Sequence, residues 1–248
     1  CEMAIDEGPL MEPSEVMAIA EDRFTAAIEY ARAAGQDSLE YLATAGRARA
    51  RLNLGKLADA AADAEAVPEG FVWYAEYSTI NGRRENRLYN VNRRNRFLSV
   101  DPERYGNLEL GGVPDPRVPA TSSGLKGHDG ATDHWYQGKY PEADSPIPMA
   151  SWYEAQLIIA EARPSEAEEA INRLRANQGL PAYVPSGDHL ADVLEERRRQ
   201  LFSEGHRLND MLRHNIPFPT GVNHKGQPYG PITCMPLPES ERRANPNI

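Results

Sequence analysis

The chain has 248 residues, 40% hydrophobic and 26% charged, an ordinary composition for a globular protein with a substantial apolar core. Its formal net charge of −10 argues against nucleic-acid binding, which needs a positively charged surface. No apolar run approaches the roughly 18 residues that a membrane-spanning helix needs, so none is predicted. The 20 prolines and 19 glycines indicate that much of the chain is loop.

The two cysteines, Cys1 and Cys234, do not have the spacing of metal ligands. An ordinary expressed chain starts with methionine, so we expect residue 1 to be a processed terminus or a point inside a longer polypeptide. Cys1 is then either the lipid-bearing first residue of a mature lipoprotein or an internal cysteine that forms a disulfide with Cys234. We favour the disulfide, because a helix is predicted almost at once. A disulfide would indicate an oxidising compartment.

Residues 13–67 are alanine-rich and predict a block of helices. Ser14 is the expected N-cap of the first helix, and Gly35 is its natural end. Further helices are predicted at 38–53 and 56–66 from their apolar periodicity. Small residues such as Gly46 and Ala50 would let two helix axes approach closely. The turn after residue 53 is typical of a tetratricopeptide repeat, although any antiparallel helical hairpin would account for it.

Residues 68–148 break this regularity and predict a loop-rich segment. Short extended pieces are expected at 71–77 and 135–140. A loop region of this length usually carries function or is disordered, and its aromatic content argues against disorder.

Residues 149–248 return to helices. Helices are predicted at 152–162, from residue 165 to about 179, and at 188–204, where Asp188 is the expected cap. After Arg213 the chain becomes a tail rich in proline and glycine.

The most informative stretch lies at residues 194–213. Helical projection places Arg197 on the buried face, where it must find carboxylate or carbonyl partners because an unpaired buried charge is costly. Glu204, Arg207 and Asp210 lie one or two turns further on and can complete a charge cluster. Gly205 is expected to relieve crowding at a helix boundary or kink. We interpret these charges as an ion-pair cluster that fixes helix packing. The alternative is an active site with Glu204 and Asp210 as an acid/base pair.

Motifs follow one another in a characteristic order in this region. They are Trp152-Tyr153-Glu154-Ala155-Gln156-Leu157-Ile158-Ile159-Ala160-Glu161-Ala162; Ala170-Ile171-Asn172-Arg173-Leu174-Arg175 with Gly179-Leu180-Pro181; Glu196-Arg197, Glu204-Gly205, Arg207, Asp210-Met211 and Arg213; and Met235-Pro236-Leu237-Pro238-Glu239 with Asn245-Pro246. This order resembles the SusD/RagB family of nutrient-uptake lipoproteins. The resemblance covers 149–248 strongly, 13–67 moderately, and 68–148 only at Asp115-Pro116-Arg117. Gln200, where the family often has Glu, and His214, where an aromatic residue often follows the arginine, are departures.

The resemblance implies a mainly α fold with tetratricopeptide-like helical hairpins (a SusD-like α-superhelix) and a long, irregular, aromatic-rich loop insertion. Residues 1–248 would form one SusD-like domain, truncated at its N-terminus. The implied function is non-catalytic binding of a glycan or other nutrient on the cell-surface side of the outer membrane. The implied partner is a SusC-like TonB-dependent transporter, with membrane contact only through a lipid anchor and no cofactor.

Sugar capture needs flat apolar faces for the C–H surfaces of the ring and polar groups for its hydroxyls. The predicted ligand-binding residues are the aromatic side chains of the loop-rich segment: Trp73, Tyr74, Tyr77, Trp135, Tyr136 and Tyr140. Each of them could instead belong to a small local core that holds the loops together.

Two other classes of function remain open. One is a tetratricopeptide-like scaffold that binds only protein, and the other is a carbohydrate-active enzyme with two facing carboxylates. No nucleophile elbow, phosphate loop or histidine–carboxylate zinc motif is present in the sequence. His128, Asp129, Asp133 and His134 could surround a cation, but their spacing follows no firm rule, and no metal site is predicted.

Overall fold

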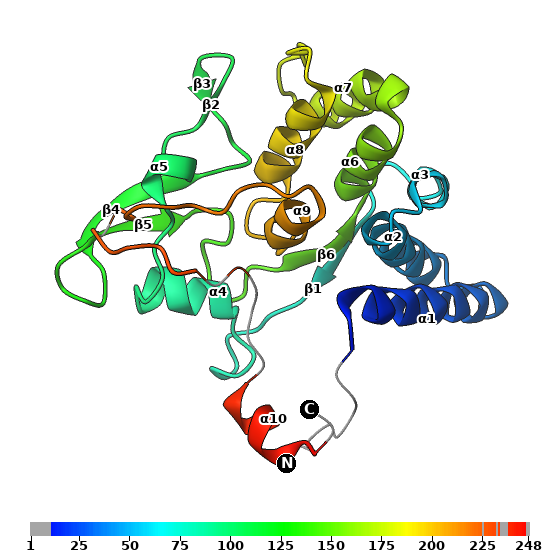
Figure 1. Cartoon of the computed structure of the whole chain (residues 1–248). Helices are drawn as coiled ribbons and strands as arrows, with labels where there is room; N and C mark the ends of the chain where they lie inside the picture. Colours follow the sequence, from blue (N-terminus) through cyan, green and yellow to red (C-terminus); the bar gives the residue numbers. More distant parts are fainter. Residues whose placement is uncertain (1–10, 225, 232, 234–237, 247–248) are drawn as a thin grey trace.

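A computed structural model of the chain describes residues 11–224, 226–231, 233 and 238–246. The main α-helices are α1 (Pro13–Ala33), α2 (Asp37–Asn53), α3 (Leu57–Glu65), α6 (Trp152–Ala162), α7 (Ala167–Asn177), α8 (His189–Gln200), α9 (Arg207–Arg213) and α10 (Glu239–Ala244). Most of them gather on one side of the molecule, and a loop-rich part with short strands forms the other side (Figure 1). In the described part of the chain, no helix has the length and apolar character needed to cross a membrane. The predicted mainly α fold is confirmed.

The first three helices pack as successive hairpins. The predicted N-cap at Ser14 is wrong, because α1 starts earlier, in a capping box between Glu12 and Glu15. Gly35 ends α1 as predicted, with a φ of +62° that favours glycine.

Gly46 of α2 allows α1 to approach closely. A Cβ atom at this position would lie 2.5 Å from Cε1 and Cζ of Phe24 on α1, which is closer than real contacts allow. The predicted role of a small residue in bringing two helix axes together is therefore confirmed at Gly46.

The main hydrophobic core surrounds α6. Trp152, Ile158, Ile171 and Val193 are almost completely buried, and they pack with the small side chains of α2 and α3. After α6 a short 3₁₀ helix, η2 (Pro164–Glu166), turns the chain into α7. Helices from both ends of the sequence thus share one core.

A two-stranded ladder joins the two halves of this helical part. Strand β1 (Val72–Ala75) follows α3 and pairs antiparallel with β6 (Ile147–Ser151), which leads directly into α6. The backbone N–H of Trp152 donates to Phe71 O at 2.8 Å and extends the pairing. The prediction of an extended segment at 71–77 is confirmed for β1, whereas β6 was not predicted.

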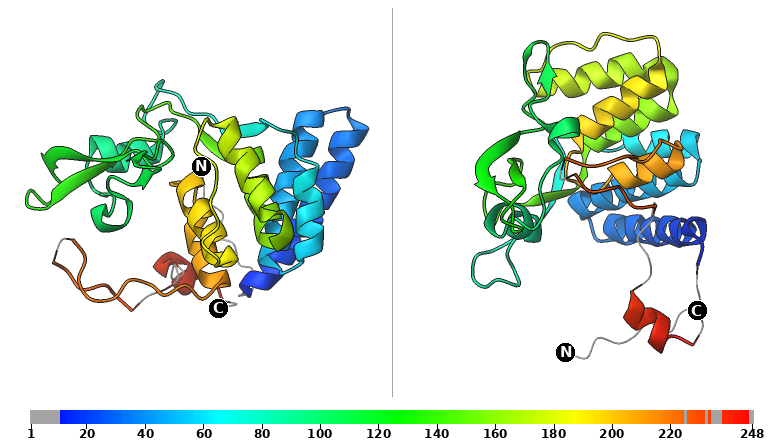
Figure 2. Two further views of the ribbon diagram at one scale, coloured as in Figure 1. Left: turned by 90° about the horizontal axis from the view of Figure 1, so that it is seen from above. Right: turned by 60° about the vertical axis from the view of Figure 1, so that its left-hand side comes forward.

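The chain between these two strands builds the loop-rich part. Its elements are α4 (Arg87–Tyr89), the π-helix η1 (Asn90–Arg94), α5 (Pro102–Tyr105), β2 (Glu109–Leu110), β3 (Val113–Pro114), β4 (Ala120–Lys126) and β5 (Asp133–Gln137). Strands β2 and β3 form one antiparallel pair, and β4 and β5 form another. Figure 2 shows from above that this part and helices α1–α3 lie at opposite ends of the molecule.

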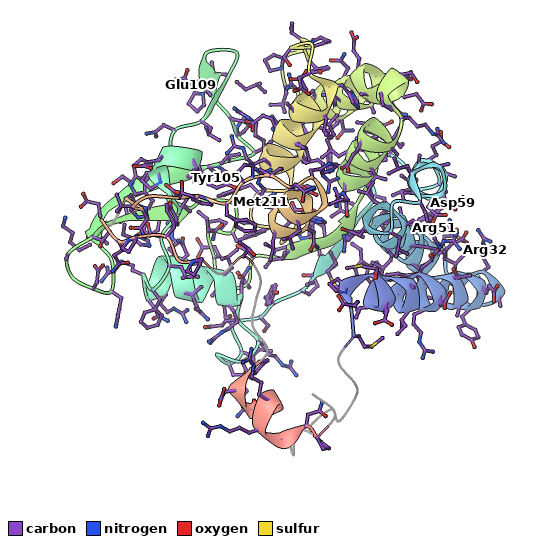
Figure 3. The ribbon with its side chains drawn as sticks, in the orientation of Figure 1. Arg32, Arg51, Asp59, Tyr105, Glu109 and Met211 are labelled. Carbon is purple, nitrogen blue, oxygen red and sulfur yellow. The ribbon has the colours of Figure 1, made fainter. Side chains whose placement is uncertain are left out.

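Apolar contacts attach the loop-rich part to the helices. The ring of Tyr105 on α5 packs on Phe202, which follows α8, with ring centroids 5.2 Å apart. Val118 and Ala120 complete this small core. In Figure 3 the labelled Tyr105 lies on the loop-rich side of the junction, and the labelled Met211 marks α9 on the helical side.

A buried ion network reinforces the same junction. The Arg117 guanidinium donates hydrogen bonds to both carboxylate oxygens of Asp115. It also donates through Nη1 to Glu196 Oε1 of α8 at 2.5 Å. Glu196 in turn accepts from Arg175 of α7, with Nη2–Oε2 at 2.7 Å. Burial alone would raise the pKa of Asp115, but its bonds to Arg117 and Arg199 lower it to about 2. One carboxylate of α8 therefore binds the loop-rich part and α7 at once.

The helix predicted at 188–204 is shorter in the structure. Asp188 caps α8 as predicted, accepting from Ala191 N, but α8 ends at Gln200. Ser203 and Gly205 then have φ of +61° and +85°, which interrupt the helix. A Cβ atom at Gly205 would meet nothing within 4 Å, so the expected relief of crowding is wrong. Its backbone conformation is the reason for glycine.

We expect Gly46→Ala to lower stability by about 1–3 kcal/mol, since the new methyl group would force the Phe24 ring from its place. Chemical denaturation would measure the change. Phe24→Leu in the same chain should recover part of the loss, because the smaller side chain leaves room for the methyl group. A full loss in the double variant would contradict the contact between Gly46 and Phe24.

Glu196→Gln is expected to cost about 3–5 kcal/mol, because Arg117 and Arg175 would lose a shared, buried carboxylate. The matched control is Glu195→Gln on the same helix. The Glu195 side chain is 43% exposed and pairs with Arg198 and Arg199 at the surface, so its loss should cost at most about 1 kcal/mol. Urea unfolding would measure both losses of stability. Equal losses in the two variants would contradict the role of Glu196 as a shared partner of Arg117 and Arg175.

Candidate functional site

The six aromatic candidates do not form one platform. Tyr74 is exposed, Tyr77 is half-buried and Tyr140 is buried. Burial raises the pKa of the Tyr140 hydroxyl, and Glu204, Tyr77 and Tyr74 add to this effect. That hydroxyl is buried without a hydrogen-bond partner among the described residues.

Two other candidates are engaged elsewhere. Trp73 is half-buried and lies opposite Ala150 in the ladder of β1 and β6. Tyr136 lies under the guanidinium of Arg93, at 4.8 Å from Cζ to the ring centroid, and its ring meets the edge of His134. The ring of Tyr136 is therefore already used in packing.

Trp135 lines a pocket. This pocket has a volume of about 400 Å³ and is lined by Pro102, Ala131, Thr132, Asp133, Trp135 and His224. Its residues come from α5, from the β4–β5 hairpin and from the C-terminal tail. We call it the Trp135 pocket.

The backbone of Trp135 is held rigidly. Its N–H donates to Ser99 Oγ at 2.9 Å, and its carbonyl accepts from Val100 N at 3.1 Å and from Asn92 Nδ2 at 3.2 Å. Gly106 lies against the indole, where a Cβ atom would come within 3.0 Å of Cζ3. A rigid ring loses little freedom when a ligand binds.

His224 reaches the pocket from the tail. A turn places Val222 opposite Pro228, and the Tyr229 hydroxyl donates to Asp101 Oδ2 at 3.4 Å, which ties the tail to the start of α5. Neither ring nitrogen of His224 has a hydrogen-bond partner among the described residues, and its Nδ1 lies 4.0 Å from Asp101 Oδ1. Both nitrogens are buried, so His224 contributes the surface of its ring to the pocket.

The pocket combines an apolar face with convergent polar groups. The indole is the aromatic side chain of the lining, and Asp133 and Thr132 contribute oxygen atoms. Binding sites for small polar molecules usually have this composition. A sugar ring has complementary faces, because its C–H groups can lie on the indole while its hydroxyls bond the polar side chains.

The predicted charge cluster separates into different contacts. Arg197 and Asp210 form a buried bidentate pair, with Nη2–Oδ1 at 2.9 Å and Nε–Oδ2 at 3.0 Å. Glu161 of α6 joins both Arg197 and Arg213, at 3.4 and 3.0 Å. Burial alone would raise the pKa of Asp210, but Arg197 and Arg213 lower it. These residues lie between α6, α8 and α9, where Arg197 and Asp210 are almost completely buried, although both also line a pocket of about 300 Å³.

Glu204 and Arg207 take no part in that contact. Glu204 accepts from Lys139 of the loop-rich part at 2.6 Å, and burial raises the pKa of its carboxyl despite this bond. Arg207 is half-buried and forms no hydrogen bond or ion pair with any described residue.

A further buried charge group adjoins the Arg197 pair. Glu154 of α6 binds Arg49 of α2 through two bonds of 2.6 Å, and His206 Nδ1 lies 3.6 Å from Glu154 Oε1. Burial opposes the charge on Glu154, but Arg49 lowers its pKa to about 2. Burial lowers the pKa of His206 to about 4. The positive charges of Arg49 and Arg197 also lower it, whereas the negative charges of Glu154 and Asp210 oppose this shift.

The remaining candidate residues have other places. His134 is buried and bonds Ser123 Oγ and Leu98 O, while Asp133 pairs with Lys126 at 2.6 Å. Asp129 accepts from Thr132, and His128 packs on Phe97. In the described part of the chain, no three His, Cys, Asp or Glu side chains are grouped as metal ligands. Cys1 and Cys234 lie outside the described residues.

His224 was not among the residues predicted from the sequence. The tail carries no hydrophobic period and many prolines and glycines, so it held no signal that would place one of its side chains beside Trp135. Only the folded chain brings the two together.

We expect stability to fall as the pH drops from about 6.5 to about 4 and His206→Gln to flatten this decline. The unfolded chain binds a proton on this imidazole near pH 6.5, whereas the folded chain resists it until about pH 4. The effect is fully present above pH 6.5 and amounts to about 3 kcal/mol. Urea unfolding across this range would measure it, with His128→Gln, an exposed histidine, as the control. Parallel profiles for the wild type and His206→Gln would refute this assignment.

Comparison with known proteins shows which fold the chain has. No protein-family model matches the sequence, and no curated protein is significantly similar to it. Among solved structures, the chain is similar to a SusD-like carbohydrate binding protein from Bacteroides vulgatus, with a TM-score of 0.66 and 18% sequence identity. The alignment covers 100% of this chain and 68% of that one. The chain therefore has a SusD-like fold, and the resemblance predicted from its motifs is confirmed at the level of the fold.

Proposed function

We propose that this protein binds glycans without cleaving them, as the substrate-capturing component of a SusCD-type uptake complex in the outer membrane. The observation that carries the proposal is the Trp135 pocket on a SusD-like fold. The structural neighbour from Bacteroides vulgatus is itself described as carbohydrate binding.

A binding role is supported by the chemistry of the pocket. Glycoside hydrolysis needs two carboxyl groups that face one cleft. Among the described residues that line the Trp135 pocket, the one carboxylate is Asp133, which is exposed and paired with Lys126. Ligand release without turnover is the expected behaviour.

The SusD-like fold and the order of the motifs support a place in an uptake complex. We propose a SusC-like TonB-dependent transporter as partner and a lipid anchor on the cell-surface side of the outer membrane. Helices α1–α3 would act as tetratricopeptide-like hairpins that face the transporter. On α1, the apolar side chains of Val16, Ile19 and Tyr30 are exposed along one face, which supports a contact with another protein.

We expect Trp135→Ala to weaken glycan binding by about ten-fold or more, that is by about 1.4 kcal/mol, because the indole face is lost. Calorimetric titration with maltoheptaose, xylohexaose, cellohexaose and mannohexaose would identify the ligand and measure the loss. Tyr30→Ala, which removes an exposed aromatic ring from α1, is the matched control and should bind as the wild type does. Unchanged affinity in Trp135→Ala would refute this site, and shorter products in the incubated mixture would refute the non-catalytic role.

A protein-binding scaffold is the second candidate, and the exposed face of α1 favours it. The two functions separate in a pull-down from solubilised native outer membranes. Val16→Asp with Ile19→Asp should release a transporter partner while leaving glycan binding intact. A chain that binds no glycan but loses its partner in this variant would be a scaffold.

A further inference from the structure

The segment that runs from β1 through η1 carries a dense group of positive charges. Residues 83–96 hold six arginines, no lysine and a single acidic residue, Glu85. This stretch therefore has a net charge of +5 in a chain whose total is −10. Its exposed arginines, which we call the arginine patch, are Arg83, Arg84, Arg87 and Arg94.

Most of the arginine patch has no counter-charge from the chain itself. Arg83, Arg84 and Arg87 form no ion pair and no side-chain hydrogen bond with any described residue. Arg94 is paired, since its Nη1 donates to Glu85 Oε2 at 2.5 Å. Like charges gathered in this way repel one another, so a surface of negative charge would stabilise them.

The backbone that carries the patch is fixed in place. Ser78 N donates to Arg84 O at 2.9 Å, which closes the turn that follows β1. Asn86 is completely buried, and it donates from its backbone to Ala143 O and from Nδ2 to Ser145 O, both at 2.7 Å. Its Oδ1 also caps α4. A partner therefore does not have to order this segment when it binds.

An apolar side chain projects from the same turn. Ile80 lies three residues before Arg83 and is 77% exposed. The turn extends away from the loop-rich part in Figure 1 and again in the right-hand view of Figure 2. Phe97 and Leu98, which directly follow the arginines, are exposed as well. Exposed apolar side chains beside basic ones are typical of protein surfaces that lie on membranes.

We propose that the arginine patch docks on an anionic membrane surface and binds the phosphates of its lipid head groups. A guanidinium group can bind phosphate through two parallel hydrogen bonds, and each basic side chain near such a surface adds to the attraction. Ile80 would enter the boundary between head groups and acyl chains. An acidic protein would match the charge but would not by itself account for this protruding apolar side chain.

This contact goes beyond the proposed function, because it is a second attachment to the membrane besides the proposed lipid anchor. It rests on that function only for the membrane at which the chain is placed. The residues involved are separate from the Trp135 pocket.

Co-sedimentation of the full chain with lipid vesicles would test the proposal. The anionic probe is phosphatidylglycerol mixed with phosphatidylethanolamine, and the neutral probe is phosphatidylcholine. We expect binding to the anionic vesicles to be about ten-fold tighter or more, and this preference to be lost between about 0.05 and about 0.5 M salt, which screens exposed charges. An acyl chain on the protein would insert into both kinds of vesicle, so the difference between them isolates the patch.

Replacing the three unpaired arginines together should weaken binding to anionic vesicles about ten-fold or more. The matched control removes the same charge from exposed arginines of the helical part and should bind nearly as the wild type does. The patch variant is Arg83→Gln with Arg84→Gln and Arg87→Gln, and the control is Arg23→Gln with Arg32→Gln and Arg173→Gln.

Ile80→Ser tests the membrane directly, because it changes no charge. This variant should bind anionic vesicles about three-fold more weakly or less tightly still, since the apolar contact with the acyl boundary is lost.

Three results would overturn the proposal. They are the lack of a preference for anionic vesicles, equal losses in the patch variant and its control, and wild-type binding by Ile80→Ser, which would leave the arginines to an acidic protein. Vesicle binding and glycan binding fail separately. Trp135→Ala should leave vesicle binding unchanged, and the patch variant should leave the calorimetric result at Trp135 intact.

Discussion

Two consecutive residues of α8, Glu196 and Arg197, carry the charge contacts on which the rest of the structure depends. Glu196 binds Arg117 of the loop-rich part and Arg175 of α7, and Arg197 binds Asp210 of α9 and Glu161 of α6. Each charge is buried and is matched by opposite charge from other elements, which is the condition for such a pair to persist in an apolar interior. A helix of twelve residues thus fixes the positions of three other helices and of the loop-rich part.

This arrangement sets the position of the loop-rich part, which carries the proposed ligand site. The loop-rich part has little core of its own beyond the small cluster around Phe202. Its position relative to the helices rests on Arg117, on Lys139 and on Tyr105, all of which contact α8 or the residues just after it. The Trp135 pocket lies further out and needs only the hairpin, α5 and the tail.

Helix positions were predictable because apolar side chains recur with the helical period, and the bounds of α2, α3 and α6 agree within one residue with those expected. Strands β4 and β6 were missed, since most of β4 is exposed and has no alternating apolar pattern. The burial of Arg197 could be inferred from its helical face. The burial of Gln200 could not, because the residues that cover it, such as Lys139, lie some sixty positions earlier in the chain. His224 depended in the same way on a contact between distant segments.

The ladder of β1 and β6 has a consequence for how such a protein can change over evolutionary time. The ladder brings the two ends of the loop-rich part, a segment of about seventy residues, side by side and directly against the helical core. Because the entropic cost of closing a loop rises only slowly with its length, this segment can grow, shrink or be replaced while its anchoring points stay the same. Ligand specificity can therefore diversify within the segment between β1 and β6, while the helical core keeps its structure.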